Sequence, residues 1–479
     1  MNSDNTASPR STPLRLRIDD GPTGGLPRPA ALYALETLAV TAGLAVRVLE
    51  EGEADIVYGP EPRQLAANGV FLRRQPIPAK ASEDAAVIWH GKHAFLYFDG
   101  AAPAAPARED GRLYIDADIV LATFLLLSGA LEEGAQSDRH GCHHVLDLAL
   151  YKLGMLHHAP VNHYADLLQG ALGKPSTDKT QHYVAALSHD VDYPEIIRWI
   201  EMARLTSQRR GRVTMREMGN ILTGRSHFWQ FGEWMELERS LGFRSAFYFC
   251  GYAGSLPGYA LRAPDPFYDV AMPQFQQMMS EMAADGFEVG LHASYNSWCN
   301  PQMLRREIDR VEQASGRKVV GNRHHYWHRG EQPLWRTARV HAEAGLVYDA
   351  SAGLERRIGF RNGISTPFHY YDAERERAST VLQLPSCLMD SQLFDYRDLS
   401  YFNDPWKEVD QVLKELRTYG GLFLTNFHNR VLNHTFFPGW KEAATHLYNT
   451  LAADSSCQVM LPEEYARLWL QREKKLRLA

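Results

Sequence analysis

The stretch Tyr183-Val-Ala-Ala-Leu-Ser-His-Asp-Val-Asp192 joins a short apolar run to two carboxylates that stand one residue apart. The apolar part is typical of a buried strand, and the polar part begins where that strand is expected to end. Side chains two positions apart in an extended segment point to the same side, so Asp190 and Asp192 can face one site. One carboxylate can then bind a metal ion while the other takes a proton from water, a combination that suits a hydrolase.

The chain after residue 192 repeats this arrangement. Helical stretches such as 273–285, 301–314 and 404–419 alternate with short apolar runs at 245–249, 288–291, 318–320, 346–348, 382–384 and 421–425. This rhythm predicts parallel strands with crossover helices, and we expect a barrel. Polar residues follow most of the runs: His292, Arg323-His-His-Tyr326, Asp390 and His428. The carboxyl ends of barrel strands meet on one face, so the sequence predicts one polar pocket there.

Residues before 183 have a different pattern of predicted secondary structure. Residues 1–13 are rich in Ser, Thr, Asn and Pro and are expected to form a disordered tail. Residues 14–175 mix strand patterns with helical ones, the latter over 115–131 and 145–172, and predict a smaller N-terminal α/β domain. The polar stretch 174–179 marks the boundary, so the barrel is assigned to residues 183–479.

Composition limits the possible classes of function. Lys+Arg 51 against Asp+Glu 57 gives a formal net charge of −6 over 479 residues, which provides no overall positive field for a nucleic-acid polymer. Residues 1–20 lack an apolar signal sequence, and the longest apolar run, 119–127, is too short to span a bilayer. We therefore expect a cytoplasmic protein without an integral membrane segment. The five cysteines include no CxxC pair, which argues against a disulfide framework and a cysteine-rich zinc site.

Over residues 183–435 these motifs resemble the polysaccharide deacetylase family, also called the NodB-homology or carbohydrate esterase family 4 group. The resemblance implies a distorted (β/α) barrel and a metal-dependent hydrolase. The family's first motif, a strand followed by paired aspartates, is similar to Leu187-Ser-His-Asp-Val-Asp192. By this resemblance Asp190 is the catalytic base and Asp192 a metal ligand. The second motif, His-x-x-x-His, is similar to His292-Ala-Ser-Tyr-Asn296 and implies His292 and Asn296 as further ligands.

The remaining motifs complete the implied site. The third, Arg-x-Pro-Tyr, is similar to Arg323-His-His-Tyr326, in which Arg323 would orient the base. The fifth, ending in Leu-x-His, resembles Leu424-Thr-Asn-Phe-His428 and implies His428 as the general acid. Asp390 is the nearest match to the fourth motif and would orient His428. The N-terminal region is similar to an accessory region that precedes this domain in some bacterial members.

The identity of the third metal ligand is the main departure from the family pattern. Asn296 stands where the family has a second histidine, and an Asn oxygen is a weaker, neutral ligand. The family commonly uses Zn²⁺, bound by one Asp and two His, so we expect Zn²⁺ here with reduced affinity unless another group replaces Asn296. The available replacements are His189, His324 and His325.

The resemblance implies removal of N-acetyl or O-acetyl groups from a saccharide. Without an export signal, we expect a nucleotide- or lipid-linked saccharide of surface-polysaccharide biosynthesis. Tyr326, Trp298 and Trp327 are expected to bind it, because aromatic planes stack on sugar rings. Two alternatives stay open: a carbohydrate-binding protein that has lost catalysis, and another metal-dependent C–N amide hydrolase on the same barrel. The presence of a general base and a general acid argues against the first.

Two other patterns have simpler explanations. Arg139-His-Gly-Cys-His-His144 could form a transition-metal clip, but without a second cluster it is interpreted as a polar loop. Residues 204–216 carry five arginines near Trp199 and are interpreted as a solvated helix face. Contact with an acidic substrate or partner is the alternative for that stretch.

Overall fold

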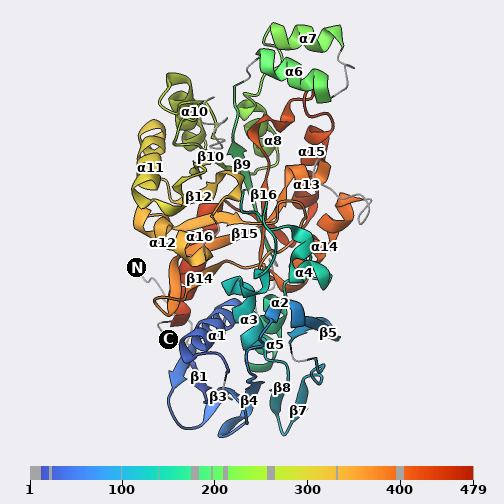
Figure 1. The fold of residues 1–479 in the computed structure, drawn as a ribbon, viewed down its shortest axis with the longest axis vertical. Helices are drawn as coiled ribbons and strands as arrows, with labels where there is room; N and C mark the ends of the chain where they lie inside the picture. The colour runs from blue at the N-terminus through green and yellow to red at the C-terminus, as the bar shows by residue number, and fades with distance from the viewer. Residues whose placement is uncertain are drawn as a thin grey trace, which may run out of the picture.

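The computed structural model describes residues 12–20, 24–98, 100–138, 140–173, 183–195, 198–208, 214–255, 265–330, 333–394 and 404–477. A small α/β unit and a barrel follow one another along the long axis of the molecule (Figure 1). Residues 1–11 of the expected tail and the expected boundary at 174–179 lie outside the described residues. Within the described ranges, no helix is both long enough and apolar enough to cross a bilayer.

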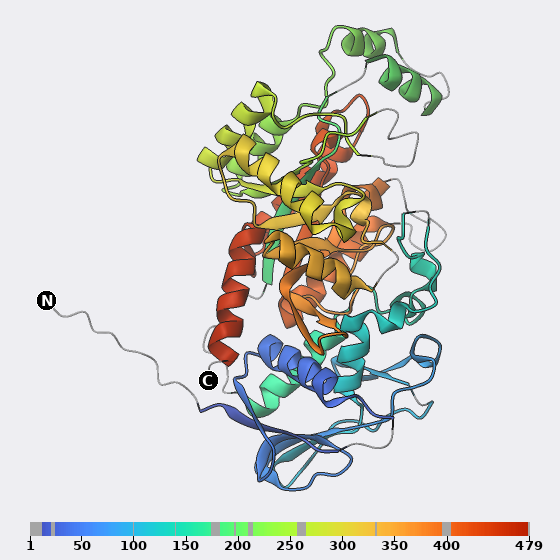
Figure 2. The same cartoon turned by 60° about the vertical axis from the view of Figure 1, so that its left-hand side comes forward.

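The N-terminal unit is a six-stranded sheet with helices between it and the barrel (Figure 2). The strand order is β2-β1-β3-β4-β8-β7, and all neighbours are parallel except β7, which runs antiparallel to β8. A separate antiparallel hairpin joins β5 and β6. The strand bounds are β1 (Leu14–Ile18), β2 (Val46–Leu49), β3 (Ala54–Gly59), β4 (Leu65–Arg73), β5 (Ala86–His90), β6 (His93–Tyr97), β7 (Ala107–Glu109) and β8 (Arg112–Ile115).

The helices of this unit differ from the sequence prediction at two places. The helical stretch expected over 145–172 is interrupted, because Gly154 adopts a left-handed φ of 69° and Pro160 starts a new helix. The helix expected over 115–131 is shorter, because Ile115 ends a strand and Gly129, at φ 82°, ends the helix. The helix bounds are α1 (Arg28–Ala42), α2 (Ala81–Asp84), α3 (Ile119–Ser128), α4 (Ala149–Lys152) and α5 (Pro160–Leu172).

In the second part, seven parallel strands within the described residues close into a barrel, in the order β9-β10-β11-β12-β13-β15-β16 and back to β9. Strand β14 adds to β15 in the antiparallel sense, and β17 adds to β9 in the parallel sense. The predicted fold class, a distorted (β/α) barrel with a smaller N-terminal α/β domain, is confirmed. The strand bounds are β9 (Tyr183–Val191), β10 (Ser245–Phe249), β11 (Glu288–Ala293), β12 (Gly321–His324), β13 (Tyr348–Ala352), β14 (Phe368–Asp372), β15 (Arg377–Met389), β16 (Leu422–Asn426) and β17 (Cys457–Val459).

One barrel strand lies later than its apolar run predicts. The run 318–320 precedes β12, whose sequence Gly321-Asn-Arg-His324 is polar but wholly buried. Polar side chains are stable there because they have partners inside the barrel; Asn322 Nδ2, for example, donates to Asp349 Oδ1 at 3.0 Å. The helices of this part are α6 (Arg198–Gln208), α7 (Met215–Leu222), α8 (Phe231–Ser240), α10 (Pro273–Ala284), α11 (Pro301–Ser315), α12 (Leu334–Ala344), α13 (Asp390–Phe394), α14 (Pro405–Tyr419), α15 (Trp440–Ala453) and α16 (Pro462–Arg477).

The two parts share one apolar core. Side chains of α1, α3 and α5 pack with buried residues of the barrel segment 335–371. Arg361 of the barrel donates two hydrogen bonds to the Glu132 carboxylate, at 2.8 and 2.7 Å. Helix α16 also reaches the N-terminal unit (Figure 2), where Arg472 donates to the carbonyl oxygens of Val40 and Thr41 at 3.1 and 2.9 Å. The N-terminal unit is therefore built onto the barrel.

Candidate active site

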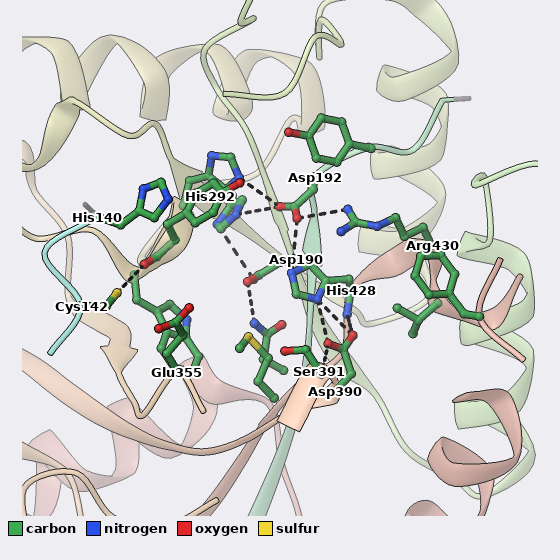
Figure 3. A pocket seen from close by; sticks show the side chains of 18 of the residues that line it. His140, Cys142, Asp190, Asp192, His292, Glu355, Asp390, Ser391, His428 and Arg430 are labelled. Carbon is green, nitrogen blue, oxygen red and sulfur yellow. Dashed lines mark hydrogen bonds and ion pairs between the residues drawn. The ribbon is translucent and has the colours of Figure 1, made fainter. Parts of the chain in front are cut away.

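The carboxyl ends of the barrel strands surround one cavity (Figure 3). Its volume, counted to the open mouth, is about 890 Å³. Both parts of the chain contribute to its wall. The lining residues are Asp138, His140, Cys142, Asp190, Asp192, Tyr193, His292, His325, Tyr326, Trp327, Glu355, Met389, Asp390, Ser391, Asn426, His428, Arg430, Val431, Phe437 and Trp440.

Asp190 lies at the end of β9 with both carboxylate oxygens hydrogen-bonded. Arg323 donates from Nη1 to Oδ1 at 3.0 Å, and Asn426 donates from Nδ2 to Oδ2 at 2.7 Å. Burial disfavours the charged carboxylate, but Arg323, followed by His292 and His428, outweighs burial and lowers the pKa of Asp190. The Asp190 carboxylate is therefore ionised at neutral pH and held in one orientation.

Beside Asp190, one carboxylate and two imidazoles form a compact, buried group. Oδ1 of Asp192 lies 3.1 Å from Nε2 of His292 and 3.8 Å from Nε2 of His325. The three possible ligand atoms all lie within 4.8 Å of one another. Ligand atoms 2.0–2.1 Å from a tetrahedral zinc ion lie about 3.3 Å apart, so the spacing and the donor types fit such an ion.

The outer nitrogen of each imidazole is held in a way that directs Nε2 toward Asp192. His292 Nδ1 donates to the carbonyl oxygen of Arg323 at 2.8 Å. His325 Nδ1 lies 3.3 Å from Oδ1 of Asp265, a buried carboxylate that also accepts from the backbone N–H of Tyr295 at 2.7 Å. Histidines that bind metals are commonly oriented in this manner by a carbonyl or carboxylate behind them.

His428 lies on the other side of Asp192 and is oriented by Asp390. Its Nδ1 is 3.0 Å from each Asp390 carboxylate oxygen, its backbone N–H donates to the same carboxylate, and its Nε2 is 3.3 Å from Oδ2 of Asp192. Burial disfavours the charged imidazole, but Asp390 and Asp192 outweigh burial and raise the pKa of His428 to about 9. The His428 imidazole is therefore protonated at neutral pH.

Asp192 also receives a hydrogen bond from Arg430, whose Nη1 is 3.2 Å from Oδ2. The guanidinium of Arg430 lies 5.2 Å from the ring centre of Tyr193, another lining residue. Burial disfavours the Asp192 charge, but the charge of His428 and the hydrogen bond from His292 outweigh it and hold the Asp192 pKa well below its usual range. Asp192 thus remains anionic at neutral pH, the state in which a carboxylate can bind a metal ion.

Most of the predicted site residues meet in or directly beside this cavity: Asp190, Asp192, His292, Arg323, Tyr326, Trp327, Asp390 and His428. Two do not. Asn296 is exposed, because β11 ends at Ala293 and the chain then turns away from the barrel axis. His325, considered from the sequence only as a replacement, takes the third place in the group. Trp298 packs against Gly330 and His328 and does not line the cavity.

Three residues of the site were assigned no role from the sequence. Asn426, in the motif that ends at His428, was expected only as one of the polar residues at a strand end, and it is the last residue of β16. Arg430 follows His428 in a short turn, and its contact with Asp192 spans 238 residues. Asp265 lies between two prolines outside any strand or helix, and nothing in the local pattern distinguishes it from an ordinary turn residue.

A loop of the N-terminal unit forms part of the cavity wall. The His140 ring stacks on Tyr326 at 4.4 Å between centres, and its Nδ1 lies 3.0 Å from the hydroxyl of Tyr295. Cys142 Sγ donates to the carbonyl oxygen of Tyr326 at 3.4 Å. Tyr326 and Trp327 both have left-handed φ angles, 56° and 50°, which are strained for residues with side chains. The loop therefore supports the strained segment that directly follows His325.

A second group of one carboxylate and two histidines lies between the N-terminal unit and α14. His163 Nδ1 accepts a hydrogen bond from the backbone N–H of Ala94 at 2.9 Å, so its Nε2 carries the proton that it donates to Glu415 Oε1 at 2.6 Å. His158 Nδ1 is 3.0 Å from the other Glu415 oxygen. Hydrogen bonds account for this group without an ion.

No protein-family model matches the sequence, and no curated protein matches it. Among solved structures, the chain is similar to a Mycobacterium smegmatis protein assigned as a polysaccharide deacetylase, at 17% identity and a TM-score of 0.40 over 62% of this chain and 93% of the other. It is also similar to PuuE allantoinase, at 12% identity and a TM-score of 0.41 over 64% and 97%. The peptidoglycan deacetylase PdaC of Bacillus subtilis matches at 13% identity and a TM-score of 0.29 over 62% and 96%. At these values the similarity assigns no activity.

Proposed function

We propose that the protein is a metal-dependent deacetylase that removes N-acetyl or O-acetyl groups from a saccharide. The observation that carries the proposal is the placement of an ionised Asp190 and a protonated His428 on two sides of Asp192, in one cavity. Hydrolysis of an amide or ester needs a base for the attacking water and an acid for the leaving group. A protein that only binds carbohydrate needs neither, so this pair supports the enzyme over the binding protein.

The side chains divide the chemistry between them. Asp192, His292 and His325 would hold the ion, which when bound polarises the acyl carbonyl and makes a water more acidic. Asp190, fixed by Arg323 and Asn426, accepts the proton of the attacking water at the carboxylate. His428, with a pKa of about 9, donates its Nε2 proton to the leaving amine or alcohol. The products are acetate and a deacetylated sugar.

The aromatic lining supports a saccharide as the substrate. Tyr193, Tyr326, Trp327 and Trp440 all face the cavity, and the apolar faces of sugar rings stack on such planes. A small non-sugar amide would have no comparable use for four aromatic side chains. We propose a nucleotide- or lipid-linked saccharide of surface-polysaccharide biosynthesis as the physiological substrate.

The test combines metal analysis with acetate release. We expect the purified chain to bind Zn²⁺ near stoichiometrically, measured by inductively coupled plasma mass spectrometry, and to release acetate from N-acetylglucosamine oligosaccharides. Asp190→Asn keeps the metal but lowers kcat by about 10²- to 10⁴-fold, the usual contribution of a general base. Asp410→Asn, an exposed carboxylate on α14, is the matched control and leaves kcat unchanged. Zinc-loaded protein that releases no acetate from N- or O-acetylated saccharides would contradict the proposal.

A further inference from the structure

Helices α6 and α7 stand apart from the barrel, at the end of the molecule opposite the N-terminal sheet (Figures 1 and 2). They form a pair in which Arg198 Nη1 donates to the carbonyl oxygen of Leu222 at 2.8 Å. The inner face of the pair is satisfied, because Leu205 and Ile221 are buried against Phe228 and Phe436. The pair is thus a packed projection with a defined outer face.

The exposed sides of the pair carry several large apolar side chains. Met215 is 82% exposed and Trp199 is 71% exposed, the two highest values among the exposed large apolar side chains in the described residues. Ile200, which follows Trp199 in α6, and Leu222, at the end of α7 that contacts Arg198, are exposed too. We define the hairpin surface as Trp199, Ile200, Met215, Arg216, Leu222 and Arg225, all of which are exposed.

The charge around the hairpin surface is opposite to that of the whole chain. The sequence from 198 to 225 contains seven arginines and two glutamates, whereas the chain as a whole has a net charge of −6. Three of those arginines, in 209–213, lie outside the described residues and are not part of the defined surface. Exposed apolar side chains on paired helices, flanked by arginines, match the chemistry of an anionic lipid surface. Tryptophan in particular is favoured at the boundary between headgroups and acyl chains.

The hairpin is joined to the rim of the active-site cavity. Its inner face packs with Tyr193 and Phe437, and both of these residues also line the cavity. Tyr193 in turn lies beneath Arg430, which hydrogen-bonds Asp192. A surface that binds the outer face of the hairpin is therefore brought close to the mouth of the cavity.

We propose that the hairpin surface docks on an anionic lipid bilayer and that the saccharide substrate is attached to a lipid in that bilayer. The docking step stands on the hairpin itself, whereas the choice of substrate rests on the proposed deacetylase function. A second copy of the chain fits the hairpin surface less well, because two hairpins of the same positive charge repel each other.

Docking is tested by cosedimentation of the full chain with vesicles. Phosphatidylcholine vesicles that contain phosphatidylglycerol are expected to retain the protein, and phosphatidylcholine alone is not. Retention falls with added salt, because exposed charges are screened. Arg216→Glu/Arg225→Glu weakens retention by about 25-fold or more, at about fivefold for each arginine lost. Trp199→Ser/Met215→Ser reduces retention to the phosphatidylcholine level.

Matched variants at other exposed positions serve as controls. Ile77→Ser/Leu468→Ser removes two exposed apolar side chains, and Arg47→Glu/Arg306→Glu reverses two exposed arginines, all outside the hairpin. Both control pairs keep full retention. Equal retention on neutral and anionic vesicles, or full retention in both hairpin variants, overturns the proposal. A dimer in solution that Trp199→Ser/Met215→Ser dissociates, without vesicle binding, assigns the surface to a second copy and also overturns it.

An activity assay that compares lipid-linked with free saccharide distinguishes the docking proposal from the deacetylase proposal. With an acetylated saccharide on a lipid in anionic vesicles, kcat/KM exceeds that for the same saccharide free in solution, and Trp199→Ser/Met215→Ser removes the excess. Acetate release from the free saccharide without vesicle binding contradicts the docking proposal alone. Vesicle binding without acetate release from any saccharide contradicts the deacetylase proposal alone.

Discussion

One carboxylate meets two histidines in each of two places, inside the barrel and between the N-terminal unit and α14, and the two groups use their nitrogens differently. In the barrel, the outer nitrogens of His292 and His325 face a carbonyl and a carboxylate, so each Nε2, once it has lost its proton, can offer a lone pair to an ion beside Asp192. At the interface, a backbone N–H occupies Nδ1 of His163, and Nε2 must carry the proton given to Glu415. Residue type and spacing are nearly the same in the two groups, and the atom behind each ring decides which of them suits a metal.

The largest expected difference between the two groups is in zinc binding after one histidine is removed from each. His325→Ala should abolish stoichiometric zinc binding and acetate release, because only two of the three closely spaced donors remain. His163→Ala and Asn296→Ala should both keep the metal content of the wild type, since neither side chain contributes a lone pair to the barrel group. Metal analysis on the three purified variants decides the point. Loss of metal in Asn296→Ala, with retention in His325→Ala, would reverse the assignment.

Asp265→Asn removes the carboxylate behind His325 and leaves the three proposed ligands unchanged. We expect zinc affinity to fall about 10- to 100-fold, the usual cost of losing such a supporting group. Competition with a chromophoric chelator measures the affinity. Asp269→Asn, a partly exposed neighbour that pairs with Arg310, is the matched control. An unchanged affinity in Asp265→Asn would show that His325 is oriented by its backbone alone.

The interface group is expected to act on stability, and its effect depends on pH. Burial disfavours the Glu415 charge, but the hydrogen bonds from His158 and His163 outweigh burial and lower the pKa of Glu415 to about 2. Because this folded-state pKa lies below the unfolded value, the stabilisation is fully present above about pH 4.5 and is lost as the pH falls toward 2. Glu415→Gln should cost about 2–3 kcal/mol at pH 7 and progressively less below pH 4.5. Denaturant titrations at several pH values measure this difference, and a pH-independent cost would contradict the mechanism.

A substitution at His140 tests whether the N-terminal unit also contributes to substrate binding in the barrel cavity. His140→Ala removes the ring that stacks on Tyr326, a contact of about 0.5–1.5 kcal/mol, so KM should rise about two- to tenfold while the metal content stays constant. His144→Ala, exposed on the same loop and absent from the cavity wall, should leave KM unchanged. Equal KM values in both variants would restrict the N-terminal unit to a structural role.

The barrel and much of the candidate site were predictable because both follow from strand ends. Buried apolar runs predict parallel strands. Because the carboxyl ends of such strands converge, the sequence alone predicts that Asp190, Asp192, His292 and His428 lie close together. The strand predicted at 318–320 lies too early in the sequence. The polar strand β12 has no apolar run of its own, because partners elsewhere in the barrel, such as Asp349, stabilise it.

Contacts between distant segments set the limit of prediction. The spacing of His292 and Asn296 along the chain suggested a pair, but the second imidazole comes from the end of the neighbouring strand, so His325 was considered only as a replacement. Asp265 and His140 reach the site through loops, and loop docking leaves no periodic signal in sequence. A pattern of residue types also cannot show which imidazole nitrogen carries the proton.

Helix α16 has a consequence for the order of events during synthesis. Its Arg472 contacts Val40 across 432 residues, so α1 leaves the ribosome long before its partner exists. These contacts form late during synthesis, because α16 (Pro462–Arg477) emerges after the whole barrel and the contact closes a long loop. A nascent chain that ends before α16 lacks these clamps between the N-terminal unit and the barrel. The contacts that hold the N-terminal unit, and with it His140, to the barrel are therefore completed only after α16 has been synthesised.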